Sequence, residues 1–256
     1  MPTPRGFTIA TCAATAAAAG LMLCTGTAGA SSDDTGGNQD PQRLLAQAQE
    51  GLRTATSVRL AYLDRSTTAT TSTRLPTSMQ LSIDRSGNCA GTLTLGGHGG
   101  SVEIIKRGTE VWLKPDQTFW KAELPGQRGV TASKEFMGRY IHGSTSDSLL
   151  SGVANACDLE SLQKAAMVSA PSSLTEGLAT TLNGTRVVPL SFKVNGLTST
   201  LYITTGKDHR LYRAAQKGPD TDLSLTFTDY NKPVLTKAPP AGESVEISQV
   251  QGLPTA

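Results

Sequence analysis

Hydrophobic positions near residue 41 follow a helical spacing. Pro41 opens the segment PQRLLAQAQEGLRTAT, in which Leu44, Leu45, Ala48 and Leu52 recur at intervals of three and four. This spacing places the apolar side chains on one face of a helix and the polar residues on the other. Proline suits the first turn of a helix. The segment is therefore predicted to be a short amphipathic helix.

Beyond residue 57 the hydrophobic period changes to two. Apolar and polar residues alternate in five runs, and the turn signals RSGN, GGHGG, KRGTE and KPD lie among them. A period of two is typical of antiparallel strands with one buried face. We expect a meander of five strands whose buried face carries Val58, Leu60, Tyr62, Met79, Leu81, Ile83, Leu93, Leu95, Val102, Ile104, Val111 and Leu113.

Both tryptophans lie in the stretch EIIKRGTEVWLKPDQTFW. The alternation puts Trp112 on the face opposite the buried one, with Glu110 and Lys114. There it could pack at the edge of the sheet or contact a partner, and edge packing is the favoured interpretation. Trp120 follows in a predicted loop with Phe119, where large apolar residues usually plug the end of a core.

The alternation disappears between residues 126 and 181. The segment SKEFMGRYIH places Phe136, Tyr140 and Ile141 at helical spacing. DSLLSGVANAC and DLESLQKAA are predicted as further helical pieces, with Asp158 as N-cap of the second. SSLTEGLATTLNG is expected to be a short helical turn or a loop. These segments form a helical insert between two groups of strands.

Strands return after residue 187. Three or four further strands are predicted, with turns at Asn195-Gly196 and in GKDHR, and residues 232–256 are expected to form an extended, proline-rich tail. The predicted fold class is α+β, with a curved antiparallel sheet and helices packed across its concave face. The apolar positions of these predicted strands are Val188, Leu190, Phe192, Val194, Leu201, Ile203, Leu211, Tyr212, Leu223, Leu225 and Phe227.

The N-terminus has the order of a secretory signal peptide. Residues 1–30 contain one early arginine, an alanine-rich apolar run and a small-residue exit. Two processing routes remain open: cleavage before Ser31, or cleavage and acylation at Cys24 as in a bacterial lipoprotein. Residues 31–40 are predicted to be a flexible tether, residues 41–247 a single domain, and residues 248–256 a tail.

Removal of the leader leaves two cysteines, Cys89 and Cys157. Exported proteins meet an oxidising compartment, so these two are expected to form a disulfide. In the chain-entropy model a bridge closing so long a loop stabilises the fold by about 4 kcal/mol.

Composition and motifs argue against catalysis and against nucleic-acid binding. The 23 Lys and Arg residues nearly balance the 21 Asp and Glu residues. His98, His142 and His209 have no catalytic or metal-binding motif around them, so neither a metal nor a cofactor is expected. A hydrolase would require His142 or His209 beside a serine and a carboxylate in a cleft. The basic residues between 106 and 139 could face lipid headgroups, although a solvated surface is favoured.

Several segments together resemble the actinobacterial LppX/LprG-type cell-envelope lipoproteins, which share the LolA/LolB-like fold. The resemblance rests on the export signal that ends in Cys24, the amphipathic opening helix, GTEVWLKPD and the closing LTFTDYNKPVLTKAPPAGESV. It implies a half-barrel of antiparallel strands with helices across its mouth. It also implies a non-catalytic activity, in which an apolar cavity holds acyl chains of lipids or glycolipids and carries them across the envelope.

We therefore expect an exported protein, anchored at the outer face of the membrane or secreted, that binds lipid as a monomer. The alternative is an envelope interaction or sensor protein with a filled core. The residues expected to line or roof the cavity are Leu81, Ile83, Leu93, Leu95, Ile104, Val111, Leu113, Phe136, Tyr140, Leu149 and Leu150.

Overall fold

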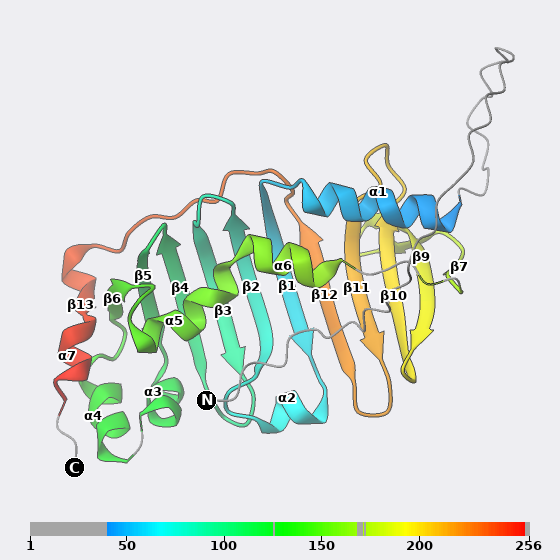
Figure 1. Ribbon diagram of the computed structural model, residues 1–256. Coiled ribbons are helices and arrows are strands. Elements are labelled where there is room, and N and C mark those ends of the chain that lie inside the picture. The colour runs from blue at the N-terminus through cyan, green and yellow to red at the C-terminus, as the bar shows by residue number, and fades with distance from the viewer. Residues whose placement is uncertain (1–39, 125, 168–170, 172, 254–256) are drawn as a thin grey trace, which may run out of the picture.

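The computed structural model describes residues 40–124, 126–167, 171 and 173–253. These residues form one sheet of 13 strands, which does not close on itself, and helices that cover one of its faces (Figure 1). The α+β class with a curved half-barrel sheet is confirmed. The predicted signal peptide, its two processing routes at Cys24 and Ser31, and the tether before Asp40 lie outside the described residues.

The strands run in two groups along the chain. Those of the first group are β1 (Ser57–Asp64), β2 (Pro76–Asp84), β3 (Cys89–Leu95), β4 (Ser101–Arg107), β5 (Glu110–Pro115) and β6 (Tyr140–Ser144). Those of the second are β7 (Thr175–Glu176), β8 (Thr180–Leu182), β9 (Thr185–Val194), β10 (Leu197–Thr204), β11 (Leu211–Lys217), β12 (Asp222–Thr228) and β13 (Ser244–Glu246). Neighbouring strands follow the order β13-β6-β5-β4-β3-β2-β1-β12-β11-β10-β9-β7, and β8 also pairs with β9.

The pairing is antiparallel except at one edge. There β13 runs parallel to β6, with Val245 opposite Ile141. The sheet is therefore mixed, whereas the sequence predicted a wholly antiparallel one. The predicted meander of the first five strands is confirmed, and β1 joins it to the second group through its pairing with β12. Because strand side chains alternate between faces, the register aligns one apolar row on the helix-covered face. The row consists of Phe227, Leu60, Leu81, Gly91, Ile104, Leu113 and Ile141.

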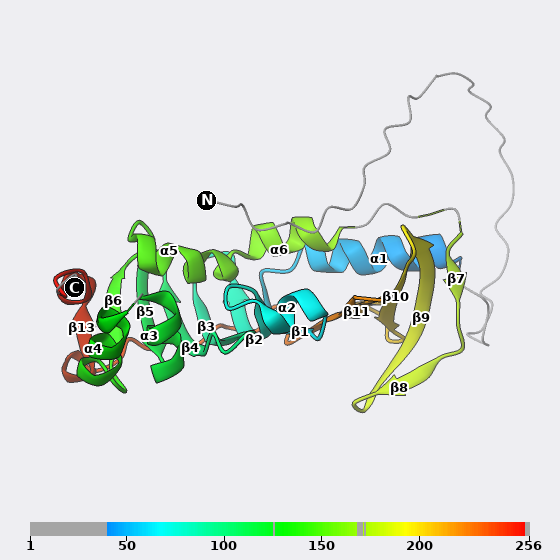
Figure 2. The ribbon, with the colours of Figure 1, turned by 90° about the horizontal axis from the view of Figure 1, so that it is seen from below.

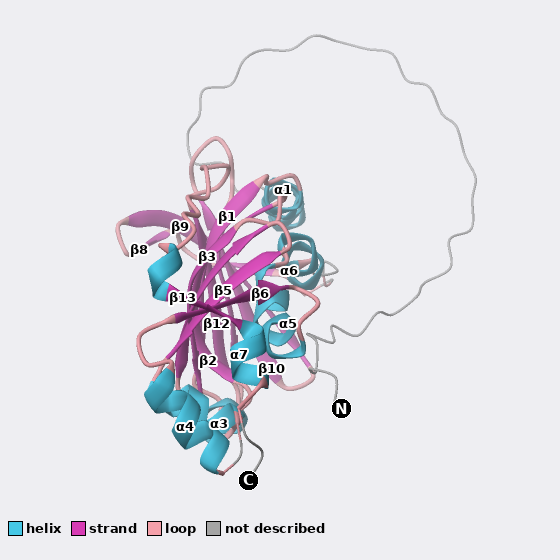
Figure 3. Cartoon of the chain, turned by 90° about the vertical axis from the view of Figure 1, so that its left-hand side faces the viewer, coloured by secondary structure: helices cyan, strands magenta, loops and turns pink. Residues whose placement is uncertain are grey.

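The helices are short and lie on one side of the sheet or at its ends. They are α1 (Pro41–Arg53), α2 (Thr67–Thr71), α3 (Gln117–Glu123), α4 (Gln127–Glu135), α5 (Ser148–Ala154), α6 (Leu159–Ala166) and α7 (Ile247–Gln251), with 3-10 turns η1 (Asn155–Cys157) and η2 (Ala241–Glu243). Figure 2 shows α1, α6 and α5 in a line along the same face of the strands. Figure 3 shows α3 and α4 together at one end of the sheet.

Helix α1 forms as its sequence predicts. Asp40 caps it by accepting a hydrogen bond from the Gln42 N–H, and Pro41 occupies its first position. Its apolar face, Leu44, Leu45, Ala48 and Leu52, is buried in a core that continues across the sheet. The side-chain amide of Gln163 in α6 donates to the carbonyl oxygens of Leu52 and Ala55 at 2.8 and 3.0 Å, which fixes α6 beside the end of α1.

The prediction of a helix through residues 133–142 was wrong. Helix α4 ends at Glu135, and Gly138 has a φ of 73°, which redirects the chain. Tyr140 then begins strand β6, which pairs with β5. The helical spacing of Phe136, Tyr140 and Ile141 therefore arose across a helix, a turn and a strand. The segment before β9 was also misassigned, because residues 175–176 and 180–182 form β7 and β8 rather than a helical turn or a loop.

The C-terminal residues are not an extended tail. Residues 244–246 form strand β13, and residues 247–251 form helix α7, which includes part of the predicted tail at 248–256. Val250 is 2% exposed and Leu253 8% exposed, and both belong to the core. In Figure 1 the link from β12 runs past the upper ends of the strands to reach β13. The folded domain thus extends beyond residue 247.

The Cys89–Cys157 disulfide is present, with 5.6 Å between the Cα atoms. It joins the first residue of β3 to the end of η1, between α5 and α6, and so fastens the helical insert to the sheet. The capping role predicted for Asp158 is also confirmed, since its Oδ1 accepts from the N–H groups of Glu160 and Ser161. Among the described residues, no helix has both the length and the apolar character needed to cross a membrane.

Candidate functional site

Most of the residues that the sequence assigns to an acyl-chain cavity lie in the packed core. Seven of them are at most 3% exposed, and they line none of the hollows described below. They are Leu81, Ile83, Ile104, Val111, Leu113, Phe136 and Leu150. Helix α5 lies directly on the sheet over β4, β5 and β6.

Tyr140 is not part of the helical roof. It lies in β6 beside Ile141, but its side chain points to the opposite face, where its hydroxyl donates to Glu103 Oε1 at 2.7 Å. Lys114 Nζ lies 5.1 Å from the centre of its ring. Burial, followed by the bond to Glu103, raises the pKa of the Tyr140 hydroxyl. The assignment of this residue to the lid therefore has to be corrected.

Trp112 packs at the edge of the sheet, as favoured from the sequence. Its ring stacks on that of His142 in the neighbouring strand, with 4.8 Å between centroids and 14° between planes. His142 Nδ1 in turn lies 2.9 Å from Glu246 Oε1 of β13, and its Nε2 lies 3.8 Å from Glu110 Oε1. These contacts attach the short parallel strand to β6, so the cluster has a structural role.

The histidines named for a hydrolase have no serine in hydrogen-bonding contact within the described part of the chain. His142 is held by the carboxylates and the indole, and His209 Nδ1 lies 3.2 Å from the Thr204 carbonyl oxygen. Nucleophilic catalysis needs the base within hydrogen-bond reach of the nucleophile. The geometry at these two imidazoles does not provide that arrangement.

An open apolar cleft of about 750 Å³ lies where the ends of β2 and β3 meet helices α3, α5 and α7; we call it the α5 cleft. Its apolar lining consists of Leu75, Pro76, Met79, Leu93, Leu95, Phe119, Leu124, Leu149, Val153, Ala156 and Val250. Arg74, Glu123, Arg128, Ser148, Asn155 and Gln251 supply the polar lining, and Gly152 completes the wall. A mostly apolar concavity with a few polar groups is the usual form of a small-molecule site.

Three of the predicted lining residues, Leu93, Leu95 and Leu149, do meet in this cleft. Sequence reasoning missed most of the others. Met79 could have been predicted to line the cleft, because it pairs directly with Leu93 in the strand register. Val153 could also have been predicted, since it follows Leu149 by one helical turn and so lies on the same face of the helix.

The sequence pattern did not indicate that Val250 would line the cleft. It reaches the cleft because β13 brings α7 to the edge of the sheet beside β6. The cleft therefore combines strand ends, an insert helix and the C-terminal helix, which are far apart in the sequence.

The wall formed by α3 is held in place by Asp116. Its Oδ1 accepts from the Phe119 N–H at 2.7 Å, which caps the helix. Its Oδ2 accepts from the N–H and the hydroxyl of Ser101, both at 2.9 Å, at the first residue of β4. Phe119 and Trp120 are consequently buried at the end of the core, although they belong to a helix rather than to the predicted loop.

A second apolar hollow lies under α6, but it is small. Its volume is about 50 Å³, and its lining includes Leu162 and Ala166 of α6 with Phe192, Leu201 and Phe227 of the sheet. A space of this size holds only a few water molecules. An acyl chain would fit there only if α6 moved away from the strands.

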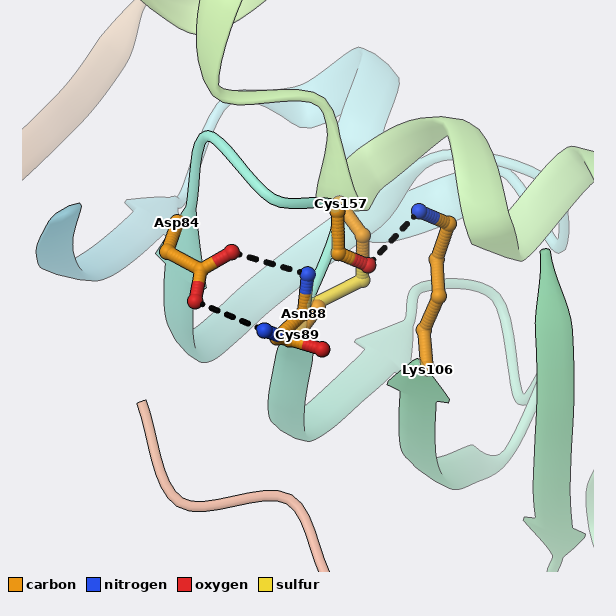
Figure 4. Close-up of a disulfide and its surroundings, with 6 residues drawn as sticks. Asp84, Asn88, Cys89, Lys106 and Cys157 are labelled. Carbon is orange, nitrogen blue, oxygen red and sulfur yellow. Dashed lines mark hydrogen bonds between the residues drawn. A yellow bond between two sulfur atoms is a disulfide. The ribbon is translucent and has the colours of Figure 1, made fainter. Parts of the chain in front are cut away.

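Charged and polar residues make up much of the lining of a third hollow, beside the disulfide. Figure 4 shows the disulfide and the hydrogen bonds around it. Asp84 accepts from the Asn88 backbone and side-chain nitrogens, both at 2.9 Å, and Lys106 Nζ donates to the Gly87 carbonyl oxygen at 2.9 Å. Burial lowers the pKa of Lys106. These polar groups order the turn that leads into Cys89, so they support the bridge.

No protein-family model and no curated protein match this chain. Among solved structures, LprF from Mycobacterium bovis is 14% identical, with 78% of this chain and 96% of LprF covered and a TM-score of 0.52. The Mycobacterium tuberculosis lipoprotein LppX is also 14% identical, with 77% and 99% covered and a TM-score of 0.48. A LolA superfamily protein from Nitrosomonas europaea is 11% identical, with 77% and 96% covered and a TM-score of 0.24. The likeness to LprF confirms the fold that the sequence resemblance implied.

Proposed function

We propose that this protein is an exported cell-envelope lipoprotein that binds acyl chains of lipids or glycolipids in the α5 cleft and carries or presents them. The observation that supports the proposal is the cleft itself, an apolar concavity of about 750 Å³ that opens to solvent. This volume falls within the range of about 300–1,000 Å³ common for small-molecule sites.

Burial of hydrocarbon would drive the binding. Transfer of each methylene from water to an apolar wall contributes about 0.8 kcal/mol, so the gain grows with the length of chain that is buried. The wall is made of aliphatic side chains such as Leu93, Leu95 and Val153, with Phe119 beside them. These groups form no hydrogen bonds that would select a particular acyl chain. The apolar wall therefore selects a ligand by the length and flexibility of its chain rather than by its detailed shape.

Export and anchoring belong to the same proposal. The N-terminal sequence has the order of a signal peptide. Acylation of Cys24 would leave the polar stretch before Asp40 as a tether between the membrane and α1. Cleavage before Ser31 would release the domain. In both cases the folded part would work outside the cytoplasm, where the Cys89–Cys157 bridge is stable.

The packed core favours one alternative, an envelope interaction or sensor protein without a lipid cargo. The seven buried residues that were expected to line a cavity belong to the packed core instead. The two functions differ in one respect, namely whether the α5 cleft takes up a chain.

Mass spectrometry of the mature protein, made in an actinobacterial envelope, tests the proposal. The intact mass is expected to show acyl chains on Cys24, and an organic extract is expected to contain a co-purified lipid in near-stoichiometric amount. Protein prepared in the same way with Gly152 replaced by phenylalanine serves as the control with an obstructed cleft. An extract free of lipid from the unaltered protein would contradict the proposal and favour the filled-core alternative.

A further inference from the structure

Two arginines on the polar side of the α5 cleft have no anionic partner among the described residues. Arg74 comes from the loop before β2, and Arg128 from the first turn of α4. Glu123 also lines the cleft, but neither arginine lies within ion-pair distance of it in the part of the chain described. Within the described ranges, therefore, neither guanidinium is paired with a carboxylate.

Arg128 is the more unusual of the two. Its Nε is buried from solvent and has no hydrogen-bond partner within the described residues. A buried donor without an acceptor is unfavourable, because it loses its hydration and gains nothing in return. In addition, Arg128 lines the same cleft as apolar residues such as Leu124 and Leu149. A ligand that carries an acceptor into the cleft would satisfy this nitrogen.

The chemistry of the acceptor follows from the guanidinium. Its donors form a rigid planar fork that matches two oxygens of a carboxylate or a phosphate. A neutral hydroxyl or ester oxygen would satisfy one donor and leave the charge uncompensated. The apolar wall and the cationic edge therefore fit the two ends of one kind of molecule.

We propose that the ligand of the α5 cleft is an anionic amphiphile whose carboxylate or phosphate is bound by Arg128, with Arg74 as a second cation, while its acyl chain lies on the apolar wall. This inference rests on the proposed function and adds the class of headgroup. Arg128 selects the charge of the ligand, and residues such as Leu95 and Val153 hold its chain.

Binding of three probes with the same chain tests the inference: palmitate, hexadecyl phosphate and hexadecanol. The unaltered protein is expected to bind at least one of the anions about tenfold or more tightly than the alcohol. The anion that binds more tightly identifies the headgroup as carboxylate or phosphate. The substitution Arg128→Gln is expected to remove about tenfold or more of the affinity for that anion and to change hexadecanol binding by less than about twofold.

Matched variants distinguish a headgroup contact from a general effect on the fold. Arg107→Gln removes an exposed arginine at the turn between β4 and β5, away from the cleft, and is expected to leave binding of all three probes unchanged. Arg128→Lys keeps the charge but loses the fork, so an intermediate affinity for the anion is expected. Thermal unfolding of each variant checks that the fold is intact.

The outcomes separate this inference from the proposed function. Equal binding of the alcohol and the anions, or an equal loss for all probes in a folded Arg128→Gln variant, would overturn the headgroup assignment while lipid binding stands. Failure of every probe to bind would remove the proposed function and this inference with it.

Discussion

Cys157, at the end of η1, is covalently joined to Cys89, the first residue of β3 and 68 positions earlier in the sequence. Helix α5 precedes the bridge and helix α6 follows it. One bond therefore holds both helices of the insert against the face of the sheet. Since α5 also forms a wall of the α5 cleft, the bridge fixes one boundary of the proposed binding site.

Reduction of this disulfide is expected to lower the free energy of unfolding by about 4 kcal/mol, because the unfolded chain regains the entropy of a long loop. Urea unfolding with and without a thiol reductant measures the difference. The double variant Cys89→Ala, Cys157→Ala should be insensitive to the reductant. An equal shift of both proteins would mean that the reductant acts elsewhere.

Two neighbouring leucines of α5 face different surroundings, one the core and the other the cleft. Leu150 is fully buried against the sheet, whereas Leu149 is partly buried and lines the α5 cleft. Leu150→Ala is expected to destabilise the protein by about 2–5 kcal/mol, since it leaves a void in close-packed surroundings. Leu149→Ala is expected to cost about 1 kcal/mol or less and to weaken the binding of an acyl probe.

Denaturant unfolding and probe titration on the same two variants test this difference. Loss of probe binding in Leu150→Ala at temperatures where it is folded, with unchanged binding in Leu149→Ala, would place the ligand on the sheet beneath α5 instead of in the cleft.

Acid is expected to weaken the N-terminus of α6 through Asp158. Its pKa is lowered chiefly by the Ser161 hydroxyl, which donates to Oδ2, and further by the N–H groups of Ser161 and Glu160. A carboxyl group whose folded-state pKa is depressed stabilises the fold above its unfolded pKa and loses that contribution as the pH falls through the folded value. The cap should therefore be intact at neutral pH and lost below about pH 4.

Asp158→Ala measures this cap. At neutral pH the variant is expected to be less stable than the unaltered protein by about 1 kcal/mol. The difference in unfolding free energy between the two proteins should narrow as the pH is lowered and Asp158 becomes protonated. A gap that stays constant from neutral pH down to pH 2 would show that the carboxylate charge contributes nothing to the cap.

The parts of the fold that could be predicted are those whose side-chain period matches local structure. Leu44 to Leu52 marked α1, and the alternation from Val58 to Leu113 marked the meander, because each run is long enough for its period to be read. Strand β6 was missed because it has five residues, of which Ile141 faces the core while the rings of Tyr140 and His142 lie on the opposite face. Helix α7 has five residues, and only its packing against β6 and β13 shows why Val250 is buried.

The candidate site was harder to predict than the fold. The period of a strand indicates which face is covered, but it does not tell whether the covering helix fills the space. Ile104 and Leu93 have the same sequence signature, yet Ile104 lies under packed side chains and Leu93 faces the α5 cleft. The difference arises from where α5 ends and where α7 returns, and both depend on tertiary contacts.

Two glycine variants test whether the α5 cleft holds an acyl chain. Gly152 lies on the cleft wall in α5, and Gly51 lies in α1 away from it; a Cβ at either position meets no atom within 4 Å. Phenylalanine at Gly152 would occupy the cleft, whereas phenylalanine at Gly51 makes a comparable change outside it.

Titration with a fluorescent polyene fatty acid compares the two variants with the unaltered protein. We expect Gly152→Phe to reduce affinity by about tenfold or more and Gly51→Phe to leave it unchanged within about twofold, because only the first variant fills the volume where the chain lies. Equal, tight binding by all three proteins would contradict the account and place the chain elsewhere.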